Sequence, residues 1–132
     1  MIEYINDGSG YQPGVCNIGP AEIRRRRQVG WAGVIATVGL AVALLLFDAP
    51  AITRMIIALP AAAAISGFLQ AHLRFCAGFA SAGLQNLGEL GEQQPIEDAE
   101  ARSADRRKAL QIYAAAMLGG FAIAMIFTLL PL

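Results

Sequence analysis

The two cysteines and the single histidine of this chain are its candidate metal ligands, and the cysteines are also candidate nucleophiles: Cys16, His72 and Cys76. If residues 70–84 continue a helix, His72 and Cys76 are four residues apart and point the same way. Thiolates and imidazoles are common zinc ligands, but a structural zinc site needs four ligands. No fourth ligand stands at a recognisable spacing. A Cys–His–Cys metal site and a buried thiol beside a surface imidazole therefore both remain open.

Cys16 also has the surroundings of a reactive thiol. It lies just before a predicted helix N-terminus at Pro20 and close to an arginine run at 24–27. Both features stabilise a thiolate, and Cys76 would then be the resolving partner. Free cysteines are more often inert packing residues, so this interpretation also stands beside a structural one.

The arginine run is the strongest concentration of charge in the chain. Clusters of basic residues next to a membrane attract anionic lipid headgroups, by about 1 kcal/mol for each basic residue. Four charges cannot enter hydrocarbon cheaply, so they also mark where a spanning segment starts. Net charge is zero, which gives no reason to expect a nucleic-acid partner. We therefore assign headgroup contact and topology control to Arg24, Arg25, Arg26 and Arg27.

The elements that carry these residues follow from the distribution of apolar residues. The 132 residues are 56% hydrophobic and 15% charged, and the charges fall between long apolar blocks. The first block has 19 residues, or roughly 28 Å of helix, which is close to the thickness of a bilayer core. The pattern predicts one all-α membrane domain over 1–132, with transmembrane helices at 29–47, 52–69 and 109–130, an N-terminal segment at 1–19, and a cytoplasmic extension and linker at 70–108.

Two of the predicted helices extend past the membrane. Pro60 should kink the second helix, because its ring removes one backbone hydrogen bond. The helical pattern then continues to Leu84, so we expect this helix to extend into the cytoplasm. The third helix should begin near Asp98 as a charged stalk. Small residues spaced four apart, among them Gly33, Gly67 and Gly120, suit close helix packing in lipid.

The distribution of basic residues predicts the orientation in the membrane. Nine of the ten basic residues lie on one side of the predicted spans, and only Arg54 lies on the other. The positive-inside rule then puts the N-terminus in the cytoplasm and the C-terminus outside. The N-terminal segment contains residues that restrict or specially adapt its backbone: Pro13, Gly14, Gly19 and Pro20. We therefore expect residues 13–19 to be ordered, to pack on the cytoplasmic end of the second helix, and to put both cysteines on one side.

Two stretches carry a resemblance: PGVCNIGPAEIRRRR at 13–27 and LRFCAGFASAGLQNLG at 73–88. Together they resemble a group of small uncharacterised bacterial membrane proteins with a CNIGPAEIxRR-like segment. The resemblance implies a multi-pass protein of the bacterial cytoplasmic (inner) membrane. It implies no activity.

The spans themselves hold no ionisable residue near their centres, which argues against transport or catalysis inside the membrane. We therefore expect a non-enzymatic accessory, assembly or scaffolding component that presents a cytoplasmic face and needs no cofactor. Its partners would be membrane lipids and another membrane protein or a second copy of the chain. The alternative is a thiol-redox or metal-binding membrane protein that uses Cys16, His72 and Cys76.

Overall fold

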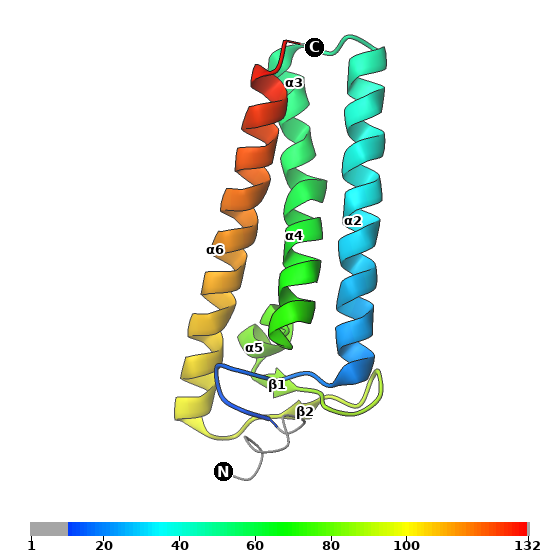
Figure 1. Cartoon of the computed structure of the whole chain (residues 1–132). Helices are drawn as coiled ribbons and strands as arrows, with labels where there is room; N and C mark the ends of the chain where they lie inside the picture. Colours follow the sequence, from blue (N-terminus) through cyan, green and yellow to red (C-terminus); the bar gives the residue numbers. More distant parts are fainter. Residues whose placement is uncertain (1–10, 132) are drawn as a thin grey trace.

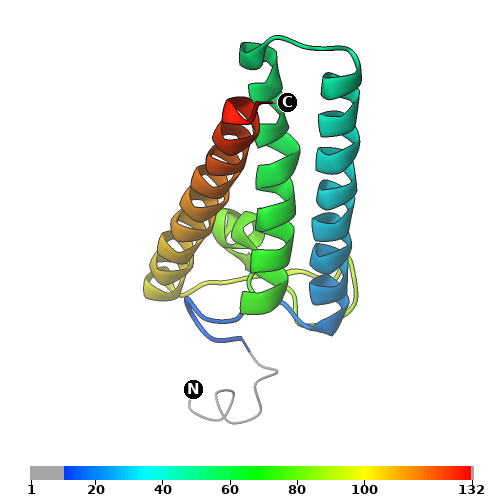
Figure 2. The ribbon, with the colours of Figure 1, turned by 45° about the horizontal axis from the view of Figure 1, so that its top comes forward.

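Three long helical segments dominate the structure, a computed structural model that describes residues 11–131 (Figure 1). The segments Pro20–Leu46, Ala51–Leu73 and Ala99–Leu129 are each long and apolar enough to cross a membrane. The prediction of a mostly helical chain with three helices of spanning length is confirmed. The middle segment lies between the other two in both Figure 1 and the turned view of Figure 2.

The first segment is α2, Pro20–Leu46. Proline occupies its first turn, where a missing N–H costs nothing, and Glu22 lies in the same turn near the positive end of the helix dipole. Its apolar stretch is only 11% buried inside the protein, and Leu46 and Phe47 are 78% and 84% exposed. Apolar area left in water costs about 25 cal/mol per Å², so this surface suits a lipid environment better than water.

The second segment is divided into α3 (Ala51–Arg54), a 3₁₀ turn at Met55–Ile57 and α4 (Ala58–Leu73). The 3₁₀ turn immediately precedes the first turn of α4, which contains Pro60. Proline has no N–H to donate to the carbonyl four residues earlier, at Ile56, so the regular α-helical ladder cannot pass through this point.

The expected continuation of the second helix as one helix to Leu84 is wrong. α4 ends at Leu73, and Arg74 adopts the left-handed conformation with φ of 55°. A separate short helix, α5 (Ala77–Ala82), follows. The break exposes backbone groups that a helix would have paired. Part of the N-terminal segment pairs them instead, since the Asn17 N–H donates to the Arg74 carbonyl at 3.2 Å.

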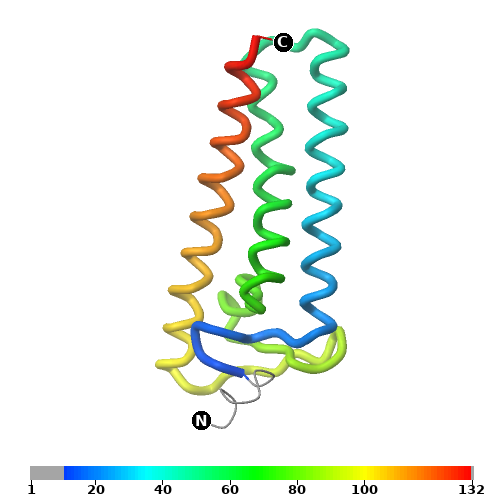
Figure 3. The backbone as a smooth tube through the Cα atoms, in the orientation of Figure 1, coloured from blue at the N-terminus to red at the C-terminus, as the bar shows by residue number. Residues whose placement is uncertain are grey.

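A small polar cap covers the end of the molecule where α4 stops and α2 begins. We call this the polar end. It comprises residues 11–19, the turn at 74–76, α5, and the loop that runs to the last helix. Two short antiparallel strands, β1 (Leu84–Gln85) and β2 (Gln94–Pro95), bracket that loop. The tube in Figure 3 shows the N-terminal segment crossing beneath the helices to reach α2.

The last helix is α6, Ala99–Leu129. The Asp98 carboxylate caps it by accepting from the Ala101 N–H at 2.9 Å. The predicted start of this helix near Asp98 is confirmed.

Small residues bring the three helices together. A Cβ atom on Gly33 would lie 2.6 Å from the Ala64 nitrogen, and one on Gly67 would lie 2.5 Å from the Gly30 nitrogen. These approaches join α2 to α4. A Cβ on Gly120 would lie 2.7 Å from the Ala58 carbonyl oxygen, which joins α4 to α6. Backbone proximity of this kind is what holds helices together in lipid.

Candidate functional site

Buried polar side chains gather at the polar end. Among residues 11–131, six polar or charged side chains are buried, and only Arg54 lies at the opposite end. Buried polar groups are costly unless they are paired, so the partners of the other five define the site. These five are Asn17, Glu22, Gln70, Asn86 and Asp105.

Hydrogen bonds from Arg26 link Glu22 to Cys76 inside the cap. The Arg26 Nη1 donates to a Glu22 carboxylate oxygen at 3.0 Å, one helical turn away. Its Nη2 donates to the Cys76 sulfur at 2.7 Å. The same sulfur accepts from the Phe79 N–H at 3.4 Å, and the guanidinium lies 5.5 Å from the Phe79 ring centroid. The guanidinium therefore joins α2 to the start of α5.

The side chain of Asn17 stabilises the backbone at the break between α4 and α5. Its side-chain nitrogen donates to the Cys76 carbonyl at 3.1 Å, and its side-chain oxygen accepts from the Cys76 N–H at 2.7 Å. Gln70 assists from the last turn of α4, where its side-chain oxygen accepts from the Ala77 N–H at 2.9 Å. The two amides thus satisfy the backbone where the helix is interrupted.

Asn86 connects the loop after β1 to the same network. Its side-chain nitrogen donates to the second Glu22 oxygen at 3.0 Å and to the Glu89 carbonyl at 2.8 Å. Its backbone N–H donates to the Asn17 carbonyl at 2.9 Å, and its carbonyl accepts from the Gly19 N–H at 2.9 Å. A Cβ at Gly19 would lie 2.5 Å from the Leu87 carbonyl oxygen, so only glycine fits this approach.

Asp105 ties the N-terminal segment to α6. One carboxylate oxygen accepts from the Tyr11 hydroxyl and the other from the Gly14 N–H, each at 2.7 Å. Gly14 has φ of 71°, in the region that favours glycine. The prediction that residues 13–19 are ordered and packed at the end of the second helix is confirmed, and the segment also contacts α6.

No family model, curated protein or solved structure matches this chain. The arrangement of these residues is therefore what indicates the function.

The predicted reactive thiol at Cys16 does not have the expected properties. Cys16 is 2% exposed, and its thiol donates to the Ile18 carbonyl at 3.6 Å. Burial raises the pKa of Cys16, and this effect exceeds the lowering by the Ile18 hydrogen bond and the Arg74 charge. Loss of water around the sulfur disfavours the thiolate more than this hydrogen bond and this charge favour it.

The structure also removes the premise of the proposed metal site. Cys76 lies beyond the end of α4, so His72 and Cys76 do not share a helical face. His72 is exposed, whereas both cysteines are buried free thiols. Across residues 11–131, no three His, Cys, Asp or Glu side chains come close enough to hold a metal ion.

The four arginines do not act alike. Arg24, Arg25 and Arg27 are exposed, whereas Arg26 points inward to Glu22 and Cys76. The i,i+4 spacing of Glu22 and Arg26 was a readable signal for this pair. Nothing local marked Asn17, Asn86 or Asp105 as members of this network, because the partners that tie them into it lie 59 to 94 residues away.

Proposed function

We propose that this chain is a non-enzymatic protein of the bacterial inner membrane that presents a rigid cytoplasmic cap to a partner. The partner is another membrane protein or a second copy of the chain. The observation that carries the proposal is the closed network around Asn17, Glu22, Arg26, Cys76 and Asn86. Within residues 11–131, no buried side-chain nitrogen or oxygen lacks a hydrogen-bond partner.

A closed network suits a binding surface better than a reaction centre. General acids, bases and nucleophiles must reach substrate, whereas these groups are turned toward one another. Fully paired polar networks rigidify a structure and specify one arrangement of it. A surface held in one shape loses less entropy when a partner binds.

The outer surface of the cap offers both charge and apolar area. A shallow depression of about 330 Å³ is lined by Arg24, Arg25 and Gln28 of α2 and by Glu89 and Leu90 of the loop. Leu90 and Val15 are each 51% exposed. Exposed arginines beside an exposed leucine suit an acidic partner segment with an apolar anchor.

The location and orientation belong to the same proposal. The polar end carries nine of the ten basic residues, which supports a cytoplasmic cap and a C-terminus outside. On this orientation the end of the second helical segment extends into the cytoplasm with α5. The 3₁₀ turn before Pro60 supports the proposed kink there.

Thiol-redox chemistry is the second candidate, and one distance favours it. The Arg26 Nη2 lies 2.7 Å from the Cys76 sulfur, so this cysteine has a cationic side chain as its direct neighbour. Cys76 is 4% exposed, however, so an oxidant reaches it only if the cap opens.

Site-specific photocrosslinking in native membranes tests the scaffold proposal. A photoreactive residue at Leu90 should give a discrete adduct, and one at Leu118, on the apolar surface of α6, should not give that adduct. Asn17→Ala should weaken the Leu90 adduct while the chain remains membrane-inserted. A chain that gives no Leu90 adduct and purifies alone from gently solubilised membranes would contradict the proposal. An adduct that survives Asn17→Ala but disappears with Cys76→Ser would favour the thiol candidate.

A further inference from the structure

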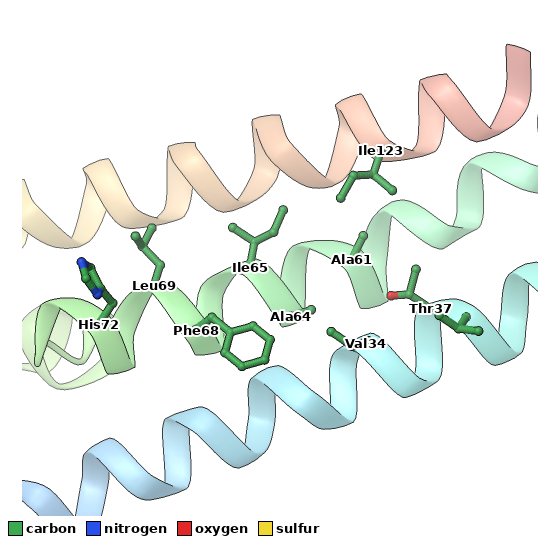
Figure 4. Close-up of a pocket in the computed structure, with 10 residues that line it drawn as sticks. Val34, Thr37, Ala61, Ala64, Ile65, Phe68, Leu69, His72 and Ile123 are labelled. Atoms are coloured by element: carbon green, nitrogen blue, oxygen red, sulfur yellow. The ribbon is translucent and has the colours of Figure 1, made fainter.

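A groove runs along the membrane-spanning part of the protein, apart from the polar cap (Figure 4). It lies over α4, between α2 and α6, and has a volume of about 530 Å³. Val34 and Val38 of α2, Ala61, Ile65 and Phe68 of α4, and Ile123 of α6 contribute its apolar lining. Its polar lining residues are Thr37 and His72.

These two polar residues differ in what they can offer a ligand. The Thr37 hydroxyl donates to the Gly33 carbonyl at 2.7 Å, so its proton is used within α2. His72 is exposed and lies in the last turn of α4, at the polar end of the groove. The groove is therefore apolar along its length and polar at one end.

A cationic side chain lies at that same end. Arg27 precedes Val34 by seven residues and Val38 by eleven, which places it on the groove face of α2. The contacts of Gly33 with Ala64 and of Gly30 with Gly67 set the register of the antiparallel pair. Continuing that register puts Arg27 level with residue 70, within one turn of His72.

The dimensions and charge match one kind of occupant. From Ala61 to His72 is eleven residues, or roughly 16 Å of helix, about half of a bilayer core and so about one leaflet. Trp31 lies at the edge of the groove, where its ring meets that of Phe68 edge-on with centroids 5.3 Å apart. Tryptophan is common at the headgroup level of membranes.

We infer that this groove binds one acyl chain of an anionic phospholipid, with the lipid phosphate held by Arg27 and His72. The acyl chain covers the apolar surface between α2 and α6. The guanidinium and imidazole supply donors to the phosphate oxygens. This site is independent of the proposed cap function, because it uses neither the network nor the loop surface.

Trp31 is the single tryptophan of the chain, so its fluorescence reports on the groove. The full chain would be reconstituted in phosphatidylcholine vesicles containing a small fraction of either dibromo-phosphatidylglycerol or dibromo-phosphatidylcholine, whose bromines quench tryptophan on contact. We expect at least fivefold stronger apparent binding of the anionic lipid. Arg27→Gln should abolish this preference, because it removes the charged donor to the lipid phosphate. His72→Gln should reduce it as well.

Arg25→Gln is the matched control. It removes the same charge from the same cluster, but residue 25 lies on the opposite side of α2 from Val34. The preference should survive Arg25→Gln and be lost in Val34→Phe, which fills the groove; Val38→Phe replaces it if that variant does not fold. Equal losses for Arg25→Gln and Arg27→Gln would show diffuse surface attraction and overturn the inference. Quenching that weakens as protein per vesicle increases would show a second copy in the groove and also overturn it.

Discussion

The side-chain amide of Asn17 pairs with both backbone polar groups of Cys76, donating to its carbonyl at 3.1 Å and accepting from its N–H at 2.7 Å. Both residues are buried, and 59 residues separate them in the chain. One side chain thus makes the pair of backbone hydrogen bonds that a neighbouring strand would make in a sheet.

Asn17→Ala should destabilise the protein strongly. It leaves the buried Cys76 N–H without its partner, while the Cys76 carbonyl keeps only its bond from the Ala80 N–H. One unsatisfied buried group costs about 1–3 kcal/mol. We expect the free energy of unfolding to fall by about 1–3 kcal/mol in SDS titrations of the detergent-solubilised protein. Gln93→Ala, on the exposed loop, is the control and should change it little. Equal stability of the two variants would show that the amide contacts do not hold the cap.

Removal of one partner of the Glu22–Arg26 pair should cost more than removal of an exposed arginine. Glu22 is 2% exposed, and breaking a buried pair leaves a charge without compensation, at about 3 kcal/mol or more. Arg26→Ala should therefore destabilise far more than Arg25→Ala in the same titration. A double-mutant cycle with Glu22→Gln measures the coupling between the two, and a coupling near zero would contradict this view.

The glycines of the α2–α4 contact should tolerate no methyl group. A Cβ on Gly67 meets the Gly30 backbone at 2.5 Å, so Gly67→Ala should force the helices apart and cost about 1–3 kcal/mol. Gly39 lies in the same membrane region and has nothing within 4 Å of an added Cβ. Gly39→Ala should be neutral or slightly stabilising, because alanine favours helix more than glycine does. Similar unfolding midpoints for the two variants would refute the close packing.

Alkaline pH should weaken the fold through Cys16. Burial raises its pKa in the folded state above the ordinary value of about 8.5, so the folded protein holds this proton more tightly than the unfolded chain does. The corresponding stability is complete below the unfolded pKa and is lost as pH rises through the folded pKa. Between pH 7.5 and 10, the wild type should lose more unfolding free energy than Cys16→Ala. Parallel pH profiles would argue against this contribution.

The rate of thiol alkylation tests whether the cap keeps its two cysteines buried. Cys16 and Cys76 are both buried, so in membranes both should react with a permeant maleimide more slowly than a cysteine placed at the exposed Val15. Asn17→Ala should speed labelling at Cys76, because it opens the turn that buries this thiol. Rapid labelling of both native cysteines in the wild type would mean that the cap is open.

The sequence alone determined the three spanning helices, the start of α6 at Asp98 and the concentration of basic residues at one end. These are local properties, because hydropathy summed over about 20 residues, helix caps and charge runs need no distant partner. Even the pairing of Glu22 with Arg26 is a local i,i+4 relation. The order of residues 13–19 was also predictable, from backbone-restricting residues followed by apolar ones.

Only the tertiary structure decided where the second helix breaks and which thiols are buried. Residues 70–84 have a helical pattern, and the break at Arg74 is stable because Asn17 pairs the freed backbone of Cys76. The same packing desolvates Cys16, against the local features that favoured a thiolate. A helix end is stable wherever its unpaired groups find partners. At this break the decisive partner, Asn17, lies 59 residues from Cys76, beyond what any local pattern reports.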